Sequence, residues 1–232
     1  YWLRRLPEDW CLPEIPAAVG ARAQELESRE QPERPEFDWA GRTVRRIGTV
    51  VHRWLMRWAQ QLPHNRDGDF LAPYRESFRR ELISEGVGGE ELAAAVSRVE
   101  EALGRVLSDD RGLWLLAAHP EARCEYPVTG ILEGKLSSVV LDRTFVDDQG
   151  QRWIVDYKVG RHSGTDREAF LDREQERYRS QLEHYARLMA LWEERPMRLG
   201  LYFPLIQGWR EWAWSEPAQE TKDTRQTPSP AR

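Results

Sequence analysis

The spacing of the apolar residues changes near residue 122, and this change limits the folds open to the chain. Before that point apolar side chains recur every three or four residues, as on one face of an α-helix. After it, three consecutive segments alternate apolar and polar residues, which is the period of a half-buried β-strand. The sequence therefore predicts helices packed on a sheet whose neighbouring strands follow one another along the chain.

Apolar spacing and turn residues together predict the order of the elements. The predicted helices cover residues 42–62, 74–85, 90–107 and 166–194, while residues 111–118 fit either a short helix or a strand. Strands are predicted over 123–134, 135–148, 151–160, 197–205 and 209–214, the last as an antiparallel edge strand. The "DDQG" stretch at 147–150 marks a hairpin. The predicted class is α/β, a mixed central sheet flanked by helices.

The two ends of the chain differ in composition from this central part. Prolines recur in residues 1–40, which we expect to form an extended arm or linker, and residues 216–232 are polar enough to be disordered. Residues 41–215 are then the predicted domain. Because the chain begins at Tyr1, we expect it to be a fragment of a longer protein.

Charge and cysteine content argue against several classes of function. The formal net charge of −5 argues mildly against a nonspecific nucleic-acid binder, although it is compatible with a local basic groove. Cys11 and Cys124 are too few for a four-thiolate zinc or iron–sulfur site, and we interpret both as free thiols of a cytoplasmic protein. No apolar run is long enough to span a membrane.

The stretch "WIVDYKVG", residues 153–160, places an acid and a base on one face of a predicted strand. Asp156 and Lys158 are two residues apart and share a face, whereas Tyr157 points the other way. In the preceding strand Ser138, Val140, Asp142 and Thr144 are expected to share one face, so the hairpin brings Asp142 towards Asp156. Two facing carboxylates repel each other unless a cation lies between them, which predicts a Mg²⁺ site with Lys158 beside it. The alternative is a structural Asp–Lys pair at a strand end.

These residues, with "YRSQLEHYARLMALW" and "LYFPL" further on, resemble the PD-(D/E)xK nuclease superfamily. More closely, residues 45–215 resemble the RecB-type exonuclease domain found at the C-terminus of bacterial UvrD-like helicase–nucleases. The resemblance implies a restriction-endonuclease-like fold and a metal-dependent DNA exonuclease. It further implies that residues 1–40 lead to a missing helicase part, and that the protein processes double-strand breaks in repair and recombination.

The resemblance also implies roles for individual residues. His52 corresponds to a metal-binding histidine, and Tyr157 to a residue whose backbone carbonyl completes the shell of a Mg²⁺ ion, with Mn²⁺ as an alternative. Asp142 and Asp156 are the acidic ligands, and Lys158 and Gln181 complete the catalytic set. Four side chains are expected to contact DNA. Three lie on the predicted helix 166–194 and one lies in the loop before it: Tyr178, Tyr185, Arg177 and Arg161. Ordinary packing is an alternative for both tyrosines.

Two departures from the family pattern leave alternatives open. The segment between Gly134 and Asp142 is longer than the compact turn common in RecB-type domains, and Glu133 is either an extra acidic ligand or the polar tip of a hairpin. A second interpretation of the whole chain is a nuclease-like module that binds DNA or a partner without cutting. A third is a structural domain in which arginines such as Arg143 and Arg152 neutralise the two aspartates.

Overall fold

The computed structural model describes residues 38–63, 68–160 and 166–215. Its first half is helical, as predicted, with α1 (Asp38–Gln60), the 3₁₀ turn η1 (Ala72–Tyr74), α2 (Arg75–Ser84), α3 (Glu91–Leu107) and α4 (Asp110–Leu116). α1 begins four residues before the predicted start, and the ambiguous segment 111–118 is mostly helix. No helix within the described ranges is both long and apolar enough to cross a membrane.

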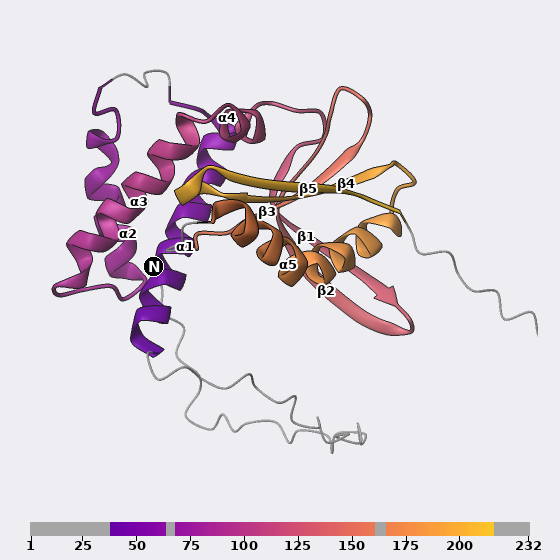
Figure 1. Cartoon of the computed structure of the whole chain (residues 1–232), viewed down its shortest axis with the longest axis horizontal. Helices are drawn as coiled ribbons and strands as arrows, with labels where there is room; N and C mark the ends of the chain where they lie inside the picture. Colours follow the sequence, from indigo (N-terminus) through magenta and orange to yellow (C-terminus); the bar gives the residue numbers. More distant parts are fainter. Residues whose placement is uncertain (1–37, 64–67, 161–165, 216–232) are drawn as a thin grey trace, which may run out of the picture. The chain divides into compact units, whose positions relative to one another are not determined.

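The second half forms one mixed five-stranded sheet (Figure 1). Its elements are β1 (Arg123–Leu132), β2 (Lys135–Val146), β3 (Arg152–Tyr157), α5 (Arg167–Ala190), β4 (Met197–Phe203), η2 (Pro204–Ile206) and β5 (Gly208–Trp214). The strands lie in chain order; β3 and β4 are parallel, and every other pair is antiparallel. Parallel neighbours need a long crossover, which α5 supplies. The predicted fold class and the antiparallel edge strand β5 are confirmed.

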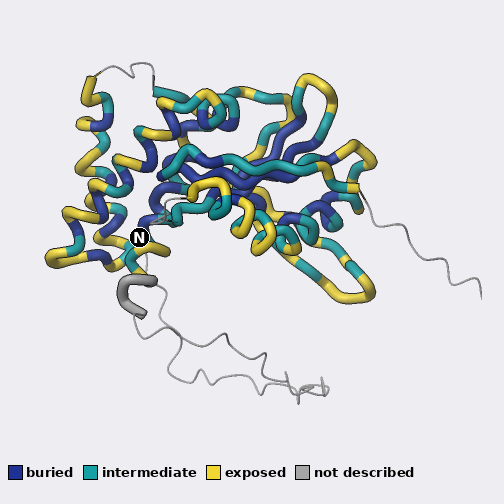
Figure 2. Tube along the Cα trace, in the orientation of Figure 1, coloured by how far each residue is buried: buried dark blue, intermediate teal, exposed yellow. Residues whose placement is uncertain are grey.

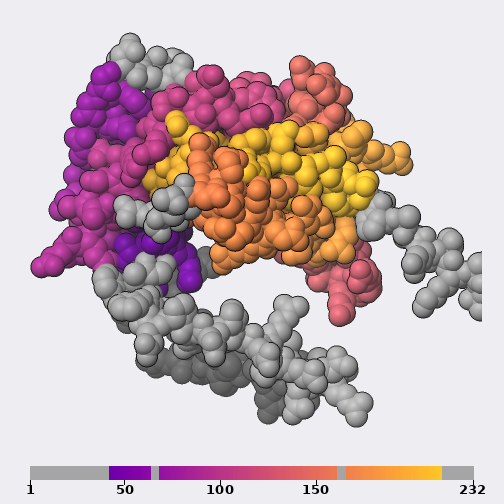
Figure 3. Space-filling model, in the orientation of Figure 1, coloured from indigo at the N-terminus to yellow at the C-terminus, as the bar shows by residue number. Residues whose placement is uncertain are grey.

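Helices cover both faces of the sheet, which produces two hydrophobic cores. The α1–α4 core joins those four helices to sheet residues that include Phe145, Trp153 and Tyr157. The α5 core joins α5 to residues that include Leu141 and Ile154. Figure 2 shows the central strands β3 and β4 as largely buried, whereas the tip of the β1–β2 hairpin is exposed, and Figure 3 shows α5 beside β5 on one face. The position of a side chain along a strand therefore determines which core it enters.

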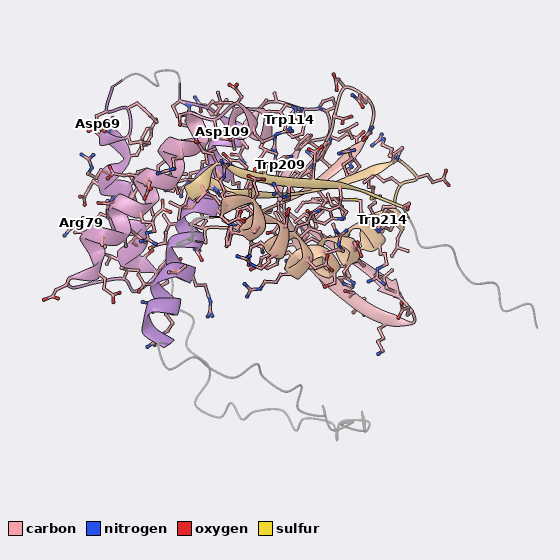
Figure 4. The ribbon with its side chains drawn as sticks, viewed as in Figure 1. Asp69, Arg79, Asp109, Trp114, Trp209 and Trp214 are labelled. Atoms are coloured by element: carbon pink, nitrogen blue, oxygen red, sulfur yellow. The ribbon has the colours of Figure 1, made fainter. Side chains whose placement is uncertain are left out.

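Aromatic rings and an arginine pack together at the edge of the α1–α4 core next to β5. The Arg111 guanidinium lies 4.8 Å from the ring centroid of Trp114 and 4.9 Å from that of Trp209, both labelled in Figure 4. Glu211 lies 3.8 Å from Arg111 and also accepts a hydrogen bond from the Trp209 indole. Several of the chain's many tryptophans thus have a packing role, since cation–π contacts of this kind stabilise partly buried arginines.

The alternation of side chains along β2 is interrupted at Asp142. Leu141 packs in the α5 core, yet Phe145 packs in the α1–α4 core, although an unbroken strand would place both on one face. Val140 and Thr144 consequently lie on opposite faces. The prediction that Ser138, Val140, Asp142 and Thr144 share one face is wrong, because it assumed a regular strand.

β1 contains a matching interruption at Glu125. The β1–β2 register runs through Tyr126↔Leu141 and Cys124↔Arg143 but skips the position at which Glu125 would pair with Asp142. Glu125 has a φ of +47°, in the left-handed region that residues other than glycine seldom adopt. The two strands therefore change face together, and an acidic residue occupies the change on each strand.

Candidate active site

The site forms where β2 and β3 separate, at the C-terminal end of β3. The last pair between these strands is Arg143↔Val155, and one further step in this register brings Asp142 opposite Asp156. There the Tyr157 N–H donates a 2.8 Å hydrogen bond to Asp142 Oδ2. The side chain of Asp142 thus takes the place of a backbone acceptor on β2. The segment between Gly134 and Asp142 is longer than in the family pattern, but it does not move Asp142 away from Asp156. The extra residues belong to β2, where it pairs with β1 before the interruption at Asp142.

Asp156 and Lys158 form an ion pair beneath α5. The Lys158 Nζ lies 2.7 Å from Asp156 Oδ2, and the aspartate is only 5% exposed. Burial, together with the charge of Asp142, raises the pKa of Asp156 to about 6, although Lys158 opposes the shift. Burial lowers the pKa of Lys158, but the carboxylate of Asp156 outweighs this effect and the net shift is upward. Removing positive charge here would therefore increase the repulsion between the buried carboxylate of Asp156 and the partly buried carboxylate of Asp142.

His52 reaches the same place from α1. Its Nε2 lies 3.0 Å from the Tyr157 carbonyl oxygen, and its Nδ1 lies 3.5 Å from Asp142 Oδ1. Burial lowers the pKa of His52, yet its hydrogen bond to Asp142 and nearby acidic charges raise it overall. The Tyr157 ring points into the α1–α4 core, so only its backbone faces the site, as the strand pattern predicted.

α5 places three of the predicted side chains over the acid–base pair. The Gln181 amide donates to Asp156 Oδ1 at 3.4 Å and to the Tyr185 hydroxyl. The Tyr178 ring centroid lies 4.1 Å from Lys158 Nζ. These residues share one helical face, since they are three and four positions apart. Arg177 lies next to Tyr178 but is mostly exposed, and Arg161 falls outside the described residues.

Glu125 joins the site although the sequence analysis did not select it. Ligand atoms of His52, Glu125 and Asp142 all lie within 4.8 Å of one another. Burial and the charge of Asp142 raise the pKa of Glu125. Glu133, the acid that sequence reasoning had considered, lies instead in the β1–β2 turn, where it is 3.7 Å from Arg187. The signal that identifies Glu125 is the register of the β1–β2 hairpin, in which it falls opposite Asp142.

The arginines proposed to neutralise the aspartates bind elsewhere. Arg143 donates to the carbonyl oxygens of Leu115 and Ala117. Arg152 donates to the carboxylates of Glu121 and Glu193. Within the described residues, the only basic side chains in ion-pair contact with Asp142 or Asp156 are His52 and Lys158. The hypothesis of a purely structural domain required these arginines to neutralise the aspartates, and Arg143 and Arg152 do not do so.

An open cleft of about 640 Å³ borders the site between α1 and α5. Residues of both helices and of the segment after β3 line it, including Arg45, Thr49, His52, Lys158, Arg177 and Tyr178. Three cationic side chains thus border the cleft in a chain whose net charge is negative. Glu174 also lines the cleft and lies 3.5 Å from Arg177. Since Lys158 is paired with Asp156, Arg45 is the lining cation that has no ion pair among the described residues.

The chemistry of this donor set suits a hard divalent cation. It combines carboxylate oxygens, a backbone carbonyl and one imidazole, with the carboxylates close enough to repel one another. Oxygen ligands suit Mg²⁺, and the imidazole makes Mn²⁺ an equally reasonable occupant. The buried Asp156 Oδ2 has no hydrogen bond of good geometry from the described residues, only its close approach to Lys158. These residues therefore fit the cation that the family pattern implies.

The fold and this site define a PD-(D/E)XK nuclease core. The chain belongs to the PD-(D/E)XK nuclease superfamily, whose family model matches residues 22–227. No curated protein matches the chain.

Two solved structures show similarity to the chain. One is a candidate exonuclease from Eubacterium rectale, with 18% sequence identity, a TM-score of 0.44 and coverage of 81% of this chain. The match spans 62% of that structure's own chain. The other is the protein SSO0001, with 14% identity, a TM-score of 0.29 and coverage of 77% of each chain.

Proposed function

We propose that the chain is a metal-dependent DNA exonuclease domain that hydrolyses phosphodiester bonds. The observation that carries this proposal is the close grouping of Lys158, two aspartates and His52 beside an open cleft whose lining includes basic side chains. Lys158 Nζ lies 2.7 Å from Asp156, and His52 lies 3.5 Å from Asp142. Superfamily membership supports nuclease chemistry, and the acidic and basic groups are those that phosphodiester hydrolysis requires.

In this proposal each residue has a separate task. His52, Asp142, Asp156 and the Tyr157 carbonyl hold the cation, Mg²⁺ or Mn²⁺. When bound, this ion supplies an activated water and neutralises charge on the phosphate. Lys158 orients the attacking water and stabilises negative charge that develops on the phosphate oxygens. Gln181, as a donor to Asp156, keeps that carboxylate in a fixed orientation.

The DNA strand would lie in the cleft between α1 and α5. Arg177 contacts the phosphate backbone there, and Tyr178 and Tyr185 contact the strand from α5. Arg161 adds a further positive charge in this proposal. Basic groups that follow the backbone and rings that contact bases are the usual means of binding a single strand.

The biological setting that we propose is the one the motif resemblance implies. The domain receives DNA from helicase domains of the same polypeptide and acts on double-strand ends in repair and recombination. The cytoplasm is the proposed location. The pattern from His52 to Gln181 supports this setting, because it resembles RecB-type domains attached to UvrD-like helicases.

End-labelled linear DNA and closed circular DNA test the activity. The chain is incubated with single-stranded and duplex forms of each, in Mg²⁺, Mn²⁺ or EDTA. We expect metal-dependent loss of linear DNA from its ends and survival of the circles. Lys158→Ala and Asp156→Ala should each lower the rate by about 100-fold or more, the usual effect of removing such a group.

Lys135→Ala is the matched control, because Lys135 is an exposed lysine of β2 that does not line the cleft. Degradation that persists unchanged in the Lys158 and Asp156 variants would overturn the assigned site. Binding of DNA without cutting in either metal would instead support the non-cutting module.

A further inference from the structure

We propose that Glu125 is an additional ligand of the divalent cation, and that this third carboxylate is built into the strand interruption. The inference rests on the proposed metal-dependent function, but its test does not depend on DNA cleavage. β1 thereby contributes to the site together with β2, β3 and α1.

The first argument is distance. Oxygen ligands lie about 2.1 Å from Mg²⁺, so two ligands on opposite sides of one ion are about 4.2 Å apart. The ligand atoms of His52, Glu125 and Asp142 already lie within 4.8 Å of one another. This spread is close to the separation that one ion requires of opposite ligands.

The second argument is the backbone. In the β1–β2 register Glu125 falls directly opposite Asp142, and opposite residues of an antiparallel pair share one face of the sheet. At the skipped pair, Glu125 adopts a φ of +47°, and its carboxylate comes beside that of Asp142. A left-handed conformation costs a residue other than glycine about 1 kcal/mol or more. Two like charges therefore lie side by side at a position where the pairing of β1 with β2 is interrupted and the backbone of Glu125 is strained.

The third argument is the lack of another role for this carboxylate. No donor among the described residues forms a hydrogen bond or ion pair with it. The nearby guanidinium of Arg53 lies 2.6 Å from Glu85 instead. Within the described part of the chain, Glu125 is exposed and has no ion-pair partner of its own, and the charges of His52 and Arg53 offset only part of its repulsion with Asp142, which a bound metal would relieve.

Glu133 shows that left-handed geometry alone does not make a ligand. It lies in the same hairpin with a φ of +51°, but its side chain is 86% exposed and lies 3.7 Å from Arg187. Glu133 is therefore a matched control for Glu125 in residue type, strand pair and backbone conformation.

Mn²⁺ titration by calorimetry, in the absence of DNA, tests the proposal on the full chain. Glu125→Gln should weaken Mn²⁺ binding by about tenfold or more, in the range seen when groups that support a metal site are removed. Glu125→Asp, which keeps the charge on a shorter side chain, should lose less affinity. Glu133→Gln should bind Mn²⁺ as the unmodified chain does.

The unfolding temperature gives a second test, because Glu125→Gln should change it in different directions with and without metal. In EDTA, Glu125→Gln should raise it or leave it unchanged, because the variant removes repulsion with Asp142. In saturating Mn²⁺ the same variant should melt below the unmodified chain, because less binding energy stabilises its folded state.

Equal Mn²⁺ affinity of Glu125→Gln and the unmodified chain would overturn this inference, and so would an unmodified chain that binds no Mn²⁺. If metal-dependent cutting is observed alongside equal affinity, only the role of Glu125 fails. If Glu125 supports Mn²⁺ binding but the chain cuts no DNA, the inference holds and the exonuclease proposal fails.

Discussion

At the scale of single residues, Lys158 is held by one charged neighbour and one aromatic neighbour. Its Nζ lies 2.7 Å from Asp156 and 4.1 Å from the Tyr178 ring centroid. The ring contact needs no hydroxyl. Tyr178→Phe should therefore leave kcat near its original value, whereas Tyr178→Leu should lower it. A loss of about 1 kcal/mol of cation–π energy corresponds to roughly a fivefold decrease.

Steady-state kinetics on a single-stranded oligonucleotide separate this effect from DNA binding. Lower kcat with unchanged KM in Tyr178→Leu would indicate that the ring positions Lys158. If Tyr178→Phe raises KM instead, the hydroxyl contacts the strand, and the proposed role in DNA binding is the better description.

Residue patterns predicted some of the site and missed a part that depends on backbone irregularity. The shared face of Asp156 and Lys158, and the opposite direction of the Tyr157 ring, follow from alternation in one short strand. The approach of Asp142 to Asp156 follows from the hairpin, even though the face predicted for Asp142 was wrong. Alternation within one strand does not select Glu125, because only the register of β1 against β2 places it opposite Asp142. Propensity gives glutamate no preference for a left-handed backbone.

At the scale of elements, β4 and β5 pack closely because Gly200 lacks a side chain. A Cβ atom built on Gly200 would lie 2.2 Å from a ring carbon of Trp209. Gly200→Ala should lower the free energy of unfolding by about 1–3 kcal/mol, the usual effect of overpacking. Urea unfolding monitored by tryptophan fluorescence measures this change.

Gly48→Ala in α1 is the matched comparison, because nothing lies within 4 Å of the added Cβ. Alanine is the better residue inside a helix, so this variant should raise the free energy of unfolding by about 0.5–1 kcal/mol. Similar effects at both glycines would contradict the close packing described for Trp209.

An ion-pair group joins the segments before β1 and β4 to the start of β3. Hydrogen bonds from Arg195 and Arg152 lower the pKa of Glu121 to about 2 from its ordinary value near 4.5. A lowered folded-state pKa stabilises the fold above the unfolded value, and this contribution is lost as the pH falls through the folded value. Glu121→Gln should therefore melt below the unmodified chain at pH 7.

The difference in melting temperature should shrink as the pH falls from about 4.5 towards 2, because both proteins then carry a neutral side chain at this position. Glu194→Gln, at an exposed neighbouring residue, is the control and should show little difference at any pH. A difference for Glu121→Gln that persists at pH 2 would point to packing rather than charge.

At the scale of the whole molecule, a net charge of −5 limits how strongly the chain can attract nucleic acid. Arg45, Lys158 and Arg177 are the cationic residues that line the described cleft. If each neutralises one phosphate of a single strand, log K against log salt should have a slope of about −2. Fluorescence anisotropy in EDTA measures this without cleavage. A slope steeper than about −5 would indicate a wider basic surface than the cleft.

The fold as a whole was more predictable than the site. Helical spacing in Leu92, Val96 and Val99 identified α3, and the alternation in Trp153–Tyr157 identified β3, because each pattern is local. The division into two cores depends on where β1 and β2 change face. No local pattern in the sequence marks that position.

That change of face has a mechanical consequence. His52 belongs to a helix packed in the α1–α4 core, whereas Asp156 follows Ile154 of the α5 core. A cation bound by both residues would join side chains that pack against opposite faces of the same sheet. Binding of the ion should therefore strengthen the attachment of α1 to the sheet, and the unfolding temperature should rise with Mn²⁺ concentration.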